Sequence, residues 1–202
     1  MTKTKDVIGA YKSIDFSFVR EKYKDAGTRY CFDVLDEKIV TGYYIKLACF
    51  RHLRDLQRQG QEDFPYVYSV DAFNRFLKFL SLVPNVDDLS QKLKPMNWQL
   101  FIFSQLFAWL DLDGLPRYVN TILSMARAQG KTMIAGISLN YSFLIETIGL
   151  SNQDFLVSSL NFEQTMKLYT YVKSMMSRII ENEPFKSLAV ETGLQLYTRE
   201  DR

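Results

Sequence analysis

The segment from Met125 to Thr132 constrains the fold of this chain more than any other. Its sequence, MARAQGKT, matches the phosphate-binding loop pattern GxxxxGK[ST] except that methionine replaces the first glycine. Such a loop follows a strand and opens a helix, so that backbone N–H groups and the positive end of the helix dipole point at a phosphate. Residues 118–125, YVNTILSM, are short and rich in β-branched and aromatic residues. We therefore predict a strand over 118–125 and a helix over 131–148.

Each position of the loop has a predicted role. Gly130 lets the main chain approach the phosphates, Lys131 reaches the β- and γ-phosphates, and the Thr132 hydroxyl holds Mg²⁺. Ala128 and Gln129 belong to the same predicted nucleotide-binding stretch. The alternative is a solvated helix start with an exposed lysine.

Arg127 lies inside the loop, where a small or indifferent residue is common. A guanidinium at this position can bind the γ-phosphate with two hydrogen bonds and stabilise the charge that develops in phosphoryl transfer. Together with Lys131 it is a candidate catalytic residue. A surface arginine is equally compatible with the spacing alone.

The rest of the chain divides into helical and α/β material. Helical periodicity and capping residues predict helices over 37–59, 70–82, 98–110 and 161–180, and a second strand is expected over 155–160. Strand, loop, helix, strand and helix, in this order, open a doubly wound sheet. We predict a boundary between the mainly helical part, 1–94, and the α/β part, 95–202.

Five blocks of sequence resemble one family. The loop, with its arginine and its missing first glycine, resembles the deviant Walker A motif of terminase large subunits from tailed phages. Residues 31–56, with Arg-His-Leu-Arg-Asp-Leu at 51–56, resemble the N-terminal helical block of that family, and the blocks 64–66, 97–103 and 107–109 follow in similar order. The resemblance covers nearly the whole chain.

This resemblance implies a fold and a site. The fold is α/β, a partial sheet of the P-loop NTPase type behind a mainly helical N-terminal subdomain. The cofactors are ATP and Mg²⁺. The Trp98–Gln99 pair is similar to the family's adenine-recognition motif, and a Gln amide can pair with the N6 and N7 atoms of adenine. Without the family, Trp98 is a core residue and Gln99 a helix-surface residue.

The resemblance also implies a function. Terminase large subunits are ATPases that drive viral DNA into a preformed capsid, and the full-length protein is also an endonuclease. The implied partners are double-stranded DNA, the small terminase subunit, the portal protein and further copies in a ring, without a membrane. The implied location is the cytoplasm of the host cell.

The sequence departs from the family after Thr132. A packaging ATPase needs an apolar strand that ends in Asp-Glu, the Walker B motif. Glu146 lies in a predicted helix, the segment 187–191 is a poor match, and 110–113 is expected to be a turn. The nuclease carboxylates have no counterpart either. We therefore expect a fragment that binds nucleotide weakly and hydrolyses it poorly.

Composition excludes several other classes of protein. A net charge of +2 is too small to indicate a polyanionic partner by itself. Cys31 and Cys49 are expected to be buried thiols, because two cysteines make neither a multi-bridge framework nor a four-cysteine zinc site. His52 is the only histidine, and no Gly-x-Ser-x-Gly elbow accompanies it, so we expect neither a hydrolase triad nor a histidine-based zinc site.

A basic stripe offers a second candidate surface. Arg51, Arg54 and Arg58 recur at spacings of three and four on one predicted helix, where they can contact DNA phosphates or a neighbouring subunit. The alternative is a solvated face that Asp55 partly neutralises. Two rival functions stay open for the whole chain: another P-loop phosphotransferase, or a helical module that binds nucleic acid or protein and carries a fortuitous Gly-Lys-Thr.

Overall fold

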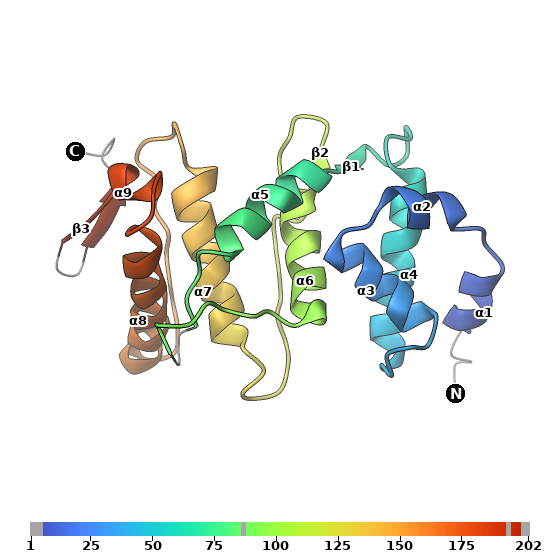
Figure 1. Cartoon of the computed structure of the whole chain (residues 1–202), viewed down its shortest axis with the longest axis horizontal. Coiled ribbons are helices and arrows are strands. Elements are labelled where there is room, and N and C mark those ends of the chain that lie inside the picture. Colours follow the sequence, from blue (N-terminus) through green and yellow to red (C-terminus); the bar gives the residue numbers. More distant parts are fainter. Residues whose placement is uncertain (1–5, 86–87, 193–194, 199–202) are drawn as a thin grey trace. The chain divides into compact units, whose positions relative to one another are not determined.

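The computed structural model describes residues 6–85, 88–192 and 195–198, and most of its elements are helices (Figure 1). The helices are α1 (Val7–Lys12), α2 (Ser17–Lys22), α3 (Ala26–Leu35), α4 (Tyr43–Arg58), α5 (Val70–Leu80), α6 (Asn97–Ala108), α7 (Lys131–Tyr141), the π-helix η1 (Ser142–Glu146), α8 (Phe162–Ile179) and α9 (Phe185–Leu188). The strands are β1 (Tyr66–Tyr68), β2 (Trp109–Asp111), β3 (Ala189–Thr192) and β4 (Gln195–Thr198).

The chain forms two compact units. The first consists of Met1–Asn74 and Pro95–Thr121, and the second of Arg75–Lys94 and Ile122–Arg202. This division differs from the single boundary predicted after residue 94. Residues 95–121 group with the first unit because α6 packs on α3 and β2 pairs with β1, two contacts between distant parts of the sequence.

The core of the first unit lies where α3 packs against α4 and α6. Asp25 caps α3, since its side chain accepts a hydrogen bond from the Thr28 backbone N–H at 3.0 Å. Gly27 brings α3 close to α6, because a Cβ atom at Gly27 would lie 2.4 Å from Ser104 Oγ. The buried apolar side chains of the three helices include Cys31, Val34, Leu35, Cys49, Leu53, Leu56, Phe101 and Phe103.

The predicted helix over 37–59 begins six residues later than expected. Glu37 has a φ of +62°, a left-handed conformation that ends the preceding turn, and Gly42 is the N-cap of α4. The apolar residues of α4 are buried unevenly, since Leu47 is 39% exposed whereas Cys49 and Leu53 are fully buried. Cys31 and Cys49 are free, buried thiols, as predicted.

A short antiparallel pair, β1 with β2, was not predicted. Tyr66 lies opposite Asp111 and Tyr68 opposite Trp109, so the end of the predicted helix 98–110 is a strand instead. Trp109 is fully buried there, edge-on to Tyr68 at a ring distance of 5.2 Å. The predicted turn after it is confirmed, because Asp111 Oδ1 accepts from the backbone N–H of Leu115 at 2.8 Å.

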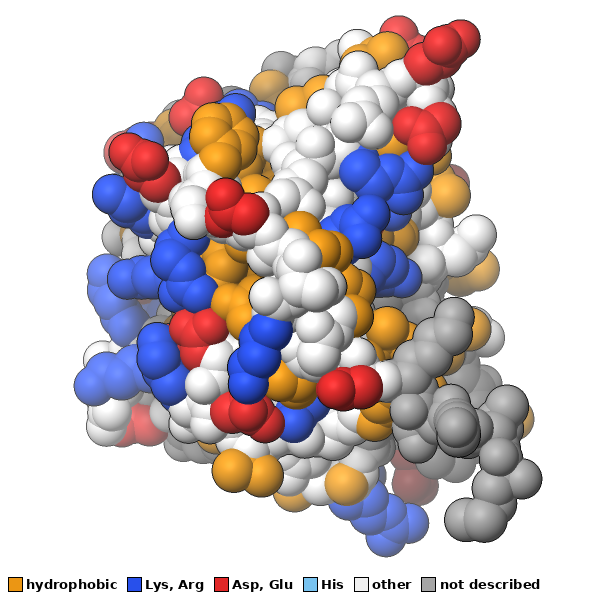
Figure 2. Space-filling view, turned by 90° about the vertical axis from the view of Figure 1, so that its right-hand side faces the viewer, with side chains coloured by type: hydrophobic (Ala, Val, Ile, Leu, Met, Phe, Trp, Pro, Cys, Tyr) orange, Lys and Arg blue, Asp and Glu red, His pale blue; other side chains and the backbone are white. Residues whose placement is uncertain are grey.

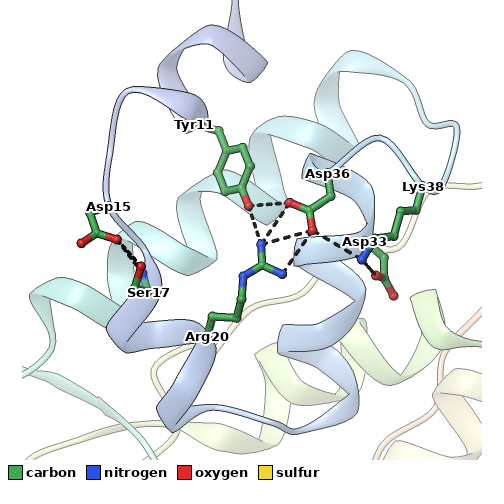
Figure 3. A network of polar contacts seen from close by, with 7 residues as sticks. All are labelled: Tyr11, Asp15, Ser17, Arg20, Asp33, Asp36 and Lys38. Carbon is green, nitrogen blue, oxygen red and sulfur yellow. Dashed lines mark hydrogen bonds and ion pairs between the residues drawn. The ribbon is translucent and has the colours of Figure 1, made fainter.

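A polar network joins the first three helices (Figure 3). Arg20 of α2 donates to both carboxylate oxygens of Asp36, at 3.0 and 3.1 Å, and Tyr11 of α1 donates to Asp36 Oδ1 at 2.7 Å. Lys38 adds ion pairs to Asp36 and Asp33. Although partial burial opposes ionisation, these hydrogen bonds hold the pKa of Asp36 below its usual value.

The second unit has an aromatic core. Phe76 and Phe79 of α5 meet Tyr141 at the end of α7, with ring distances of 5.0 and 5.3 Å. Phe185 packs against Phe79 at 6.3 Å. These aromatic side chains are buried, as expected for core residues and not for base-stacking ones.

The predicted strands over 118–125 and 155–160 are not formed. Both stretches lie outside any strand, and several of their apolar side chains are exposed: Ile122 is 95% exposed and Leu160 is fully exposed. Among the described residues only the β1–β2 and β3–β4 pairs make sheets. A strand needs a hydrogen-bonded neighbour, which local propensity does not supply. The P-loop-type sheet therefore stays a prediction.

The described helices also bear on membrane insertion. None of those within 6–85, 88–192 and 195–198 is both long enough and apolar enough to cross a bilayer.

Candidate functional site

The predicted phosphate loop forms a turn at the start of α7. Gly130 is the N-cap residue, with φ +77° and ψ 22°, and its carbonyl oxygen accepts the first helical hydrogen bond from Ile134 at 2.9 Å. Ala128 is also left-handed, with φ +60°. A left-handed alanine costs about 1 kcal/mol, a strain that is frequent in ligand-binding loops. Turns of this kind gather backbone N–H groups into an anion-binding concavity.

Lys131 is directed back over this turn. Its ammonium group donates hydrogen bonds to the backbone carbonyl oxygens of Met125 and Ala126, the second at 3.1 Å. The side chain is half-buried and lies against the residues that lead into the loop. The ammonium is thereby held at the loop, where phosphate oxygens can replace carbonyl oxygens as its acceptors.

The loop lines a large cavity. Residues 127–133 form one wall of a space of about 1070 Å³, and the opposite wall comes from α8. The α8 residues are Glu163, Met166, Lys167, Thr170 and Tyr171. Pockets that bind small molecules usually measure about 300–1,000 Å³, so this one has the size of a small-molecule site.

The α8 wall was missed by the sequence analysis. Its polar members recur at helical spacing after the Asn161 cap, so a shared face was visible in the sequence. The sequence did not show that this face packs toward a loop 30 or more residues earlier.

Arg127 and Thr132 both line the cavity and are both exposed. Thr132 lies in the first turn of α7, with its hydroxyl available to a ligand, and Arg127 lies in the turn before it. Their predicted roles as Mg²⁺ ligand and phosphate-binding arginine stay predictions. Within the described ranges no group of three or more His, Cys, Asp or Glu side chains is arranged to hold a metal ion.

Gln99 belongs to the first unit and the loop to the second. It is buried near the start of α6, and its side-chain oxygen accepts a hydrogen bond from the Met96 backbone N–H at 2.9 Å. The amide thus caps its own helix. The contact of Gln99 with adenine stays a prediction.

The acidic candidates considered for a Walker B motif lie elsewhere. Glu146 ends the π-helix and accepts a hydrogen bond from Ser142, whereas Glu191 lies in the β3 strand. Among the described residues that line the cavity, Glu163 alone carries a carboxylate. Glu163 comes from a helix and not from a strand end.

The basic stripe on α4 is only partly free. Arg51 and Arg54 are exposed, but Arg58 pairs with Asp63 at 2.9 Å and lies over the Phe64 ring. Asp55 does not neutralise the stripe as expected, because it is buried and pairs with Arg117 at 2.8 Å. The surface in Figure 2 shows Lys and Arg side chains interspersed with Asp and Glu, the usual pattern of a solvated face.

The single histidine belongs to the core. His52 is 1% exposed, and burial together with Arg117 and Arg51 lowers its pKa to about 4 despite the opposing charge of Asp25. The imidazole is therefore neutral at pH 7 and packs against Trp109 and Phe101.

No family model, curated protein sequence or solved structure matches this chain. The geometry of the loop and its cavity, together with the resemblance of the sequence motifs, is what supports a function.

Proposed function

We propose that this chain binds Mg²⁺-ATP at the loop 127–132 and acts as part of a terminase large subunit, the ATPase of a viral DNA-packaging motor. One observation carries the proposal. In the predicted loop Ala128 and Gly130 have left-handed backbone conformations, Lys131 and Thr132 begin α7, and all six residues 127–132 line a single large cavity.

The residues of the loop suit a triphosphate. The first N–H groups of α7 have no acceptor within the helix, so they are available to phosphate oxygens. Lys131 would exchange its carbonyl partners for the β- and γ-phosphates, and Arg127 would stabilise the charge that develops on the transferred phosphoryl group. Bound at Thr132, Mg²⁺ supplies further positive charge to the phosphate oxygens.

The remaining parts of the proposal rest on the resemblance. They are base recognition by Gln99, action on double-stranded DNA in the host cytoplasm, and assembly into a ring with the small subunit and the portal. The rival phosphotransferase shares the nucleotide site, whereas the rival helical binding module has none. Nucleotide binding therefore separates the proposal from the second rival.

The experiment is a titration of the purified chain with a non-hydrolysable ATP analogue and Mg²⁺. We expect Lys131→Ala to weaken binding by at least on the order of a hundredfold, since it removes the loop's central charge-assisted contact. Lys186→Ala is the matched control, because Lys186 is an exposed lysine of the same unit outside the cavity. Equal binding by the parent and Lys131→Ala would remove the nucleotide hypothesis.

A further inference from the structure

One face of α8 forms the second wall of the cavity. Glu163, Lys167, Thr170 and Tyr171 follow at intervals of four, three and one residues, so they share one side of the helix. The opposite side carries the buried Met176 and Ile179. Helix α8 therefore presents the polar side chains of Glu163, Lys167 and Thr170 to the cavity, beside Met166 and Tyr171.

The position of this wall is set by packing within the second unit. Asn140 of α7 is fully buried and donates a hydrogen bond to the Val172 carbonyl oxygen of α8 at 3.2 Å. Gly136, one turn earlier, has the side chains of Met175 and Val172 within 3.7 Å of where its Cβ would be. Figure 1 shows the two helices side by side. Helix α8 is thus held against the same helix that begins at the loop.

The charges on the two walls are unbalanced. Arg127, Lys131 and Lys167 line the cavity against one carboxylate, Glu163, so its described lining carries an excess of two positive charges. Lys131 already has acceptors in the loop carbonyls. Lys167, in contrast, is exposed and forms no hydrogen bond or ion pair with any residue described in the structure. An anion in this cavity would give it a partner.

We propose that Lys167 binds the phosphate tail of the nucleotide from the wall opposite Lys131. The inference rests on the proposed function and adds a residue and a selectivity to it. A chain of three phosphates has charge enough for both ammonium groups and the length to contact two walls, whereas a single phosphate does not. The cavity should therefore prefer nucleoside triphosphates to monophosphates, and Lys167 should contribute to that preference.

Three variants of the whole chain test this, each titrated with ATP, AMP and inorganic tripolyphosphate in the presence of Mg²⁺. Lys167→Ala should raise the Kd for ATP and tripolyphosphate by on the order of tenfold and leave the Kd for AMP within about twofold. Lys167→Arg keeps the charge and should retain most of the affinity for ATP. Lys186→Ala, an exposed lysine elsewhere in the unit, should bind all three ligands as the parent does.

The outcomes separate the two proposals. If Lys167→Ala binds ATP as the parent does while Lys131→Ala does not, the role of Lys167 is refuted and the nucleotide site stands. If Lys167→Ala loses ATP and AMP equally, its effect is not on the phosphate tail and the inference is also refuted. If the parent binds neither ATP nor tripolyphosphate, the proposed function itself fails.

Discussion

His52 lies in the core of the first unit, where its two ring nitrogens meet different partners. The Trp109 indole N–H donates to Nδ1 at 3.3 Å, and the Gln105 amide lies 3.1 Å from the same atom. An indole only donates, so Nδ1 is an acceptor and the proton of the neutral ring is on Nε2. That proton is donated to Thr28 Oγ1 at 3.1 Å. A second proton on Nδ1 would break the bond to Trp109.

This arrangement predicts a loss of stability in mild acid. The pKa of His52 is about 4 in the folded chain and near 6.5 unfolded, so the unfolded state binds one more proton between these values. The contribution of neutral His52 to the free energy of unfolding is complete above pH 6.5. It falls by about 1.4 kcal/mol per pH unit as the pH decreases, and it is lost below pH 4. In total the first unit should lose about 3 kcal/mol.

Urea unfolding followed by tryptophan fluorescence measures this effect. Trp98 and Trp109 are the only tryptophans and both belong to the first unit, so the signal reports on that unit alone. His52→Gln is less stable at pH 7 but should lose the slope between pH 6.5 and 5, a range in which most carboxylates stay ionised. An unchanged slope in this variant would assign the acid sensitivity to other groups.

At the scale of elements, two buried glycines bring helices together in different ways. Gly27 of α3 faces Ser104 of α6, and an added Cβ would lie 2.4 Å from its Oγ and 2.8 Å from its Cβ. At Gly136 of α7, an added Cβ would lie 3.7 Å from the nearest side-chain atoms of α8, an ordinary contact distance. Gly27 is required because α3 and α6 approach closely at this residue. Gly136 is not required by packing and only lowers the helix propensity of α7.

Alanine substitutions should therefore have opposite signs. Gly27→Ala forces α3 and α6 apart and should destabilise the first unit by about 1–3 kcal/mol, as overpacking does. Gly136→Ala should stabilise the second unit by about 0.5–1 kcal/mol, because alanine favours a helix interior. Thermal unfolding of both variants checks the pair. Destabilisation by Gly136→Ala of the size expected for Gly27→Ala would show that α7 and α8 pack more tightly than the distances indicate.

The same elements show what the sequence can predict. The helices with strong local signals are where they were expected, for example α5 after its Ser69 cap and α8 after Asn161, whose side chain accepts from Gln164 N–H at 2.9 Å. The turn at Gly130 was also foreseen, since glycine, lysine and threonine carry a local signal. The strand pair β1–β2 was not, because its partners are about 40 residues apart and only tertiary packing brings them together.

The two walls of the candidate site also differ in how far the sequence predicts them. Its loop wall is encoded by adjacent residues and was predicted, whereas the Lys167 wall depends on Asn140 and Gly136 joining α7 to α8. The strand predicted over 118–125 is not formed. The β-branched stretch around Ile122 has the composition of a strand, but composition does not provide the neighbouring strand that a sheet requires.

For the whole molecule, the net charge has little effect on binding, whereas the proposed nucleotide should stabilise one unit. The net charge is only +2, from 25 basic and 23 acidic residues, so the overall field gives little long-range attraction for DNA. Any binding of a polyanion must come from local groups, such as those of the cavity. The loop and the α8 wall of the proposed nucleotide site lie in the second unit, so its ligand should act on that unit first.

Hydrogen exchange with and without Mg²⁺-ATP tests this at the scale of the molecule. A ligand that binds only the folded second unit stabilises it by about 2.7 kcal/mol at a concentration of 100 Kd, which slows the exchange of its most protected amides by up to on the order of a hundredfold. We expect slower exchange in α7 and α8 and unchanged exchange in α3 and α4, whose core belongs to the first unit. Lys131→Ala should abolish the difference. Equal slowing in both units would contradict this expectation, and would mean either that they unfold as one cooperative body or that the ligand also binds the first unit, for example through Gln99.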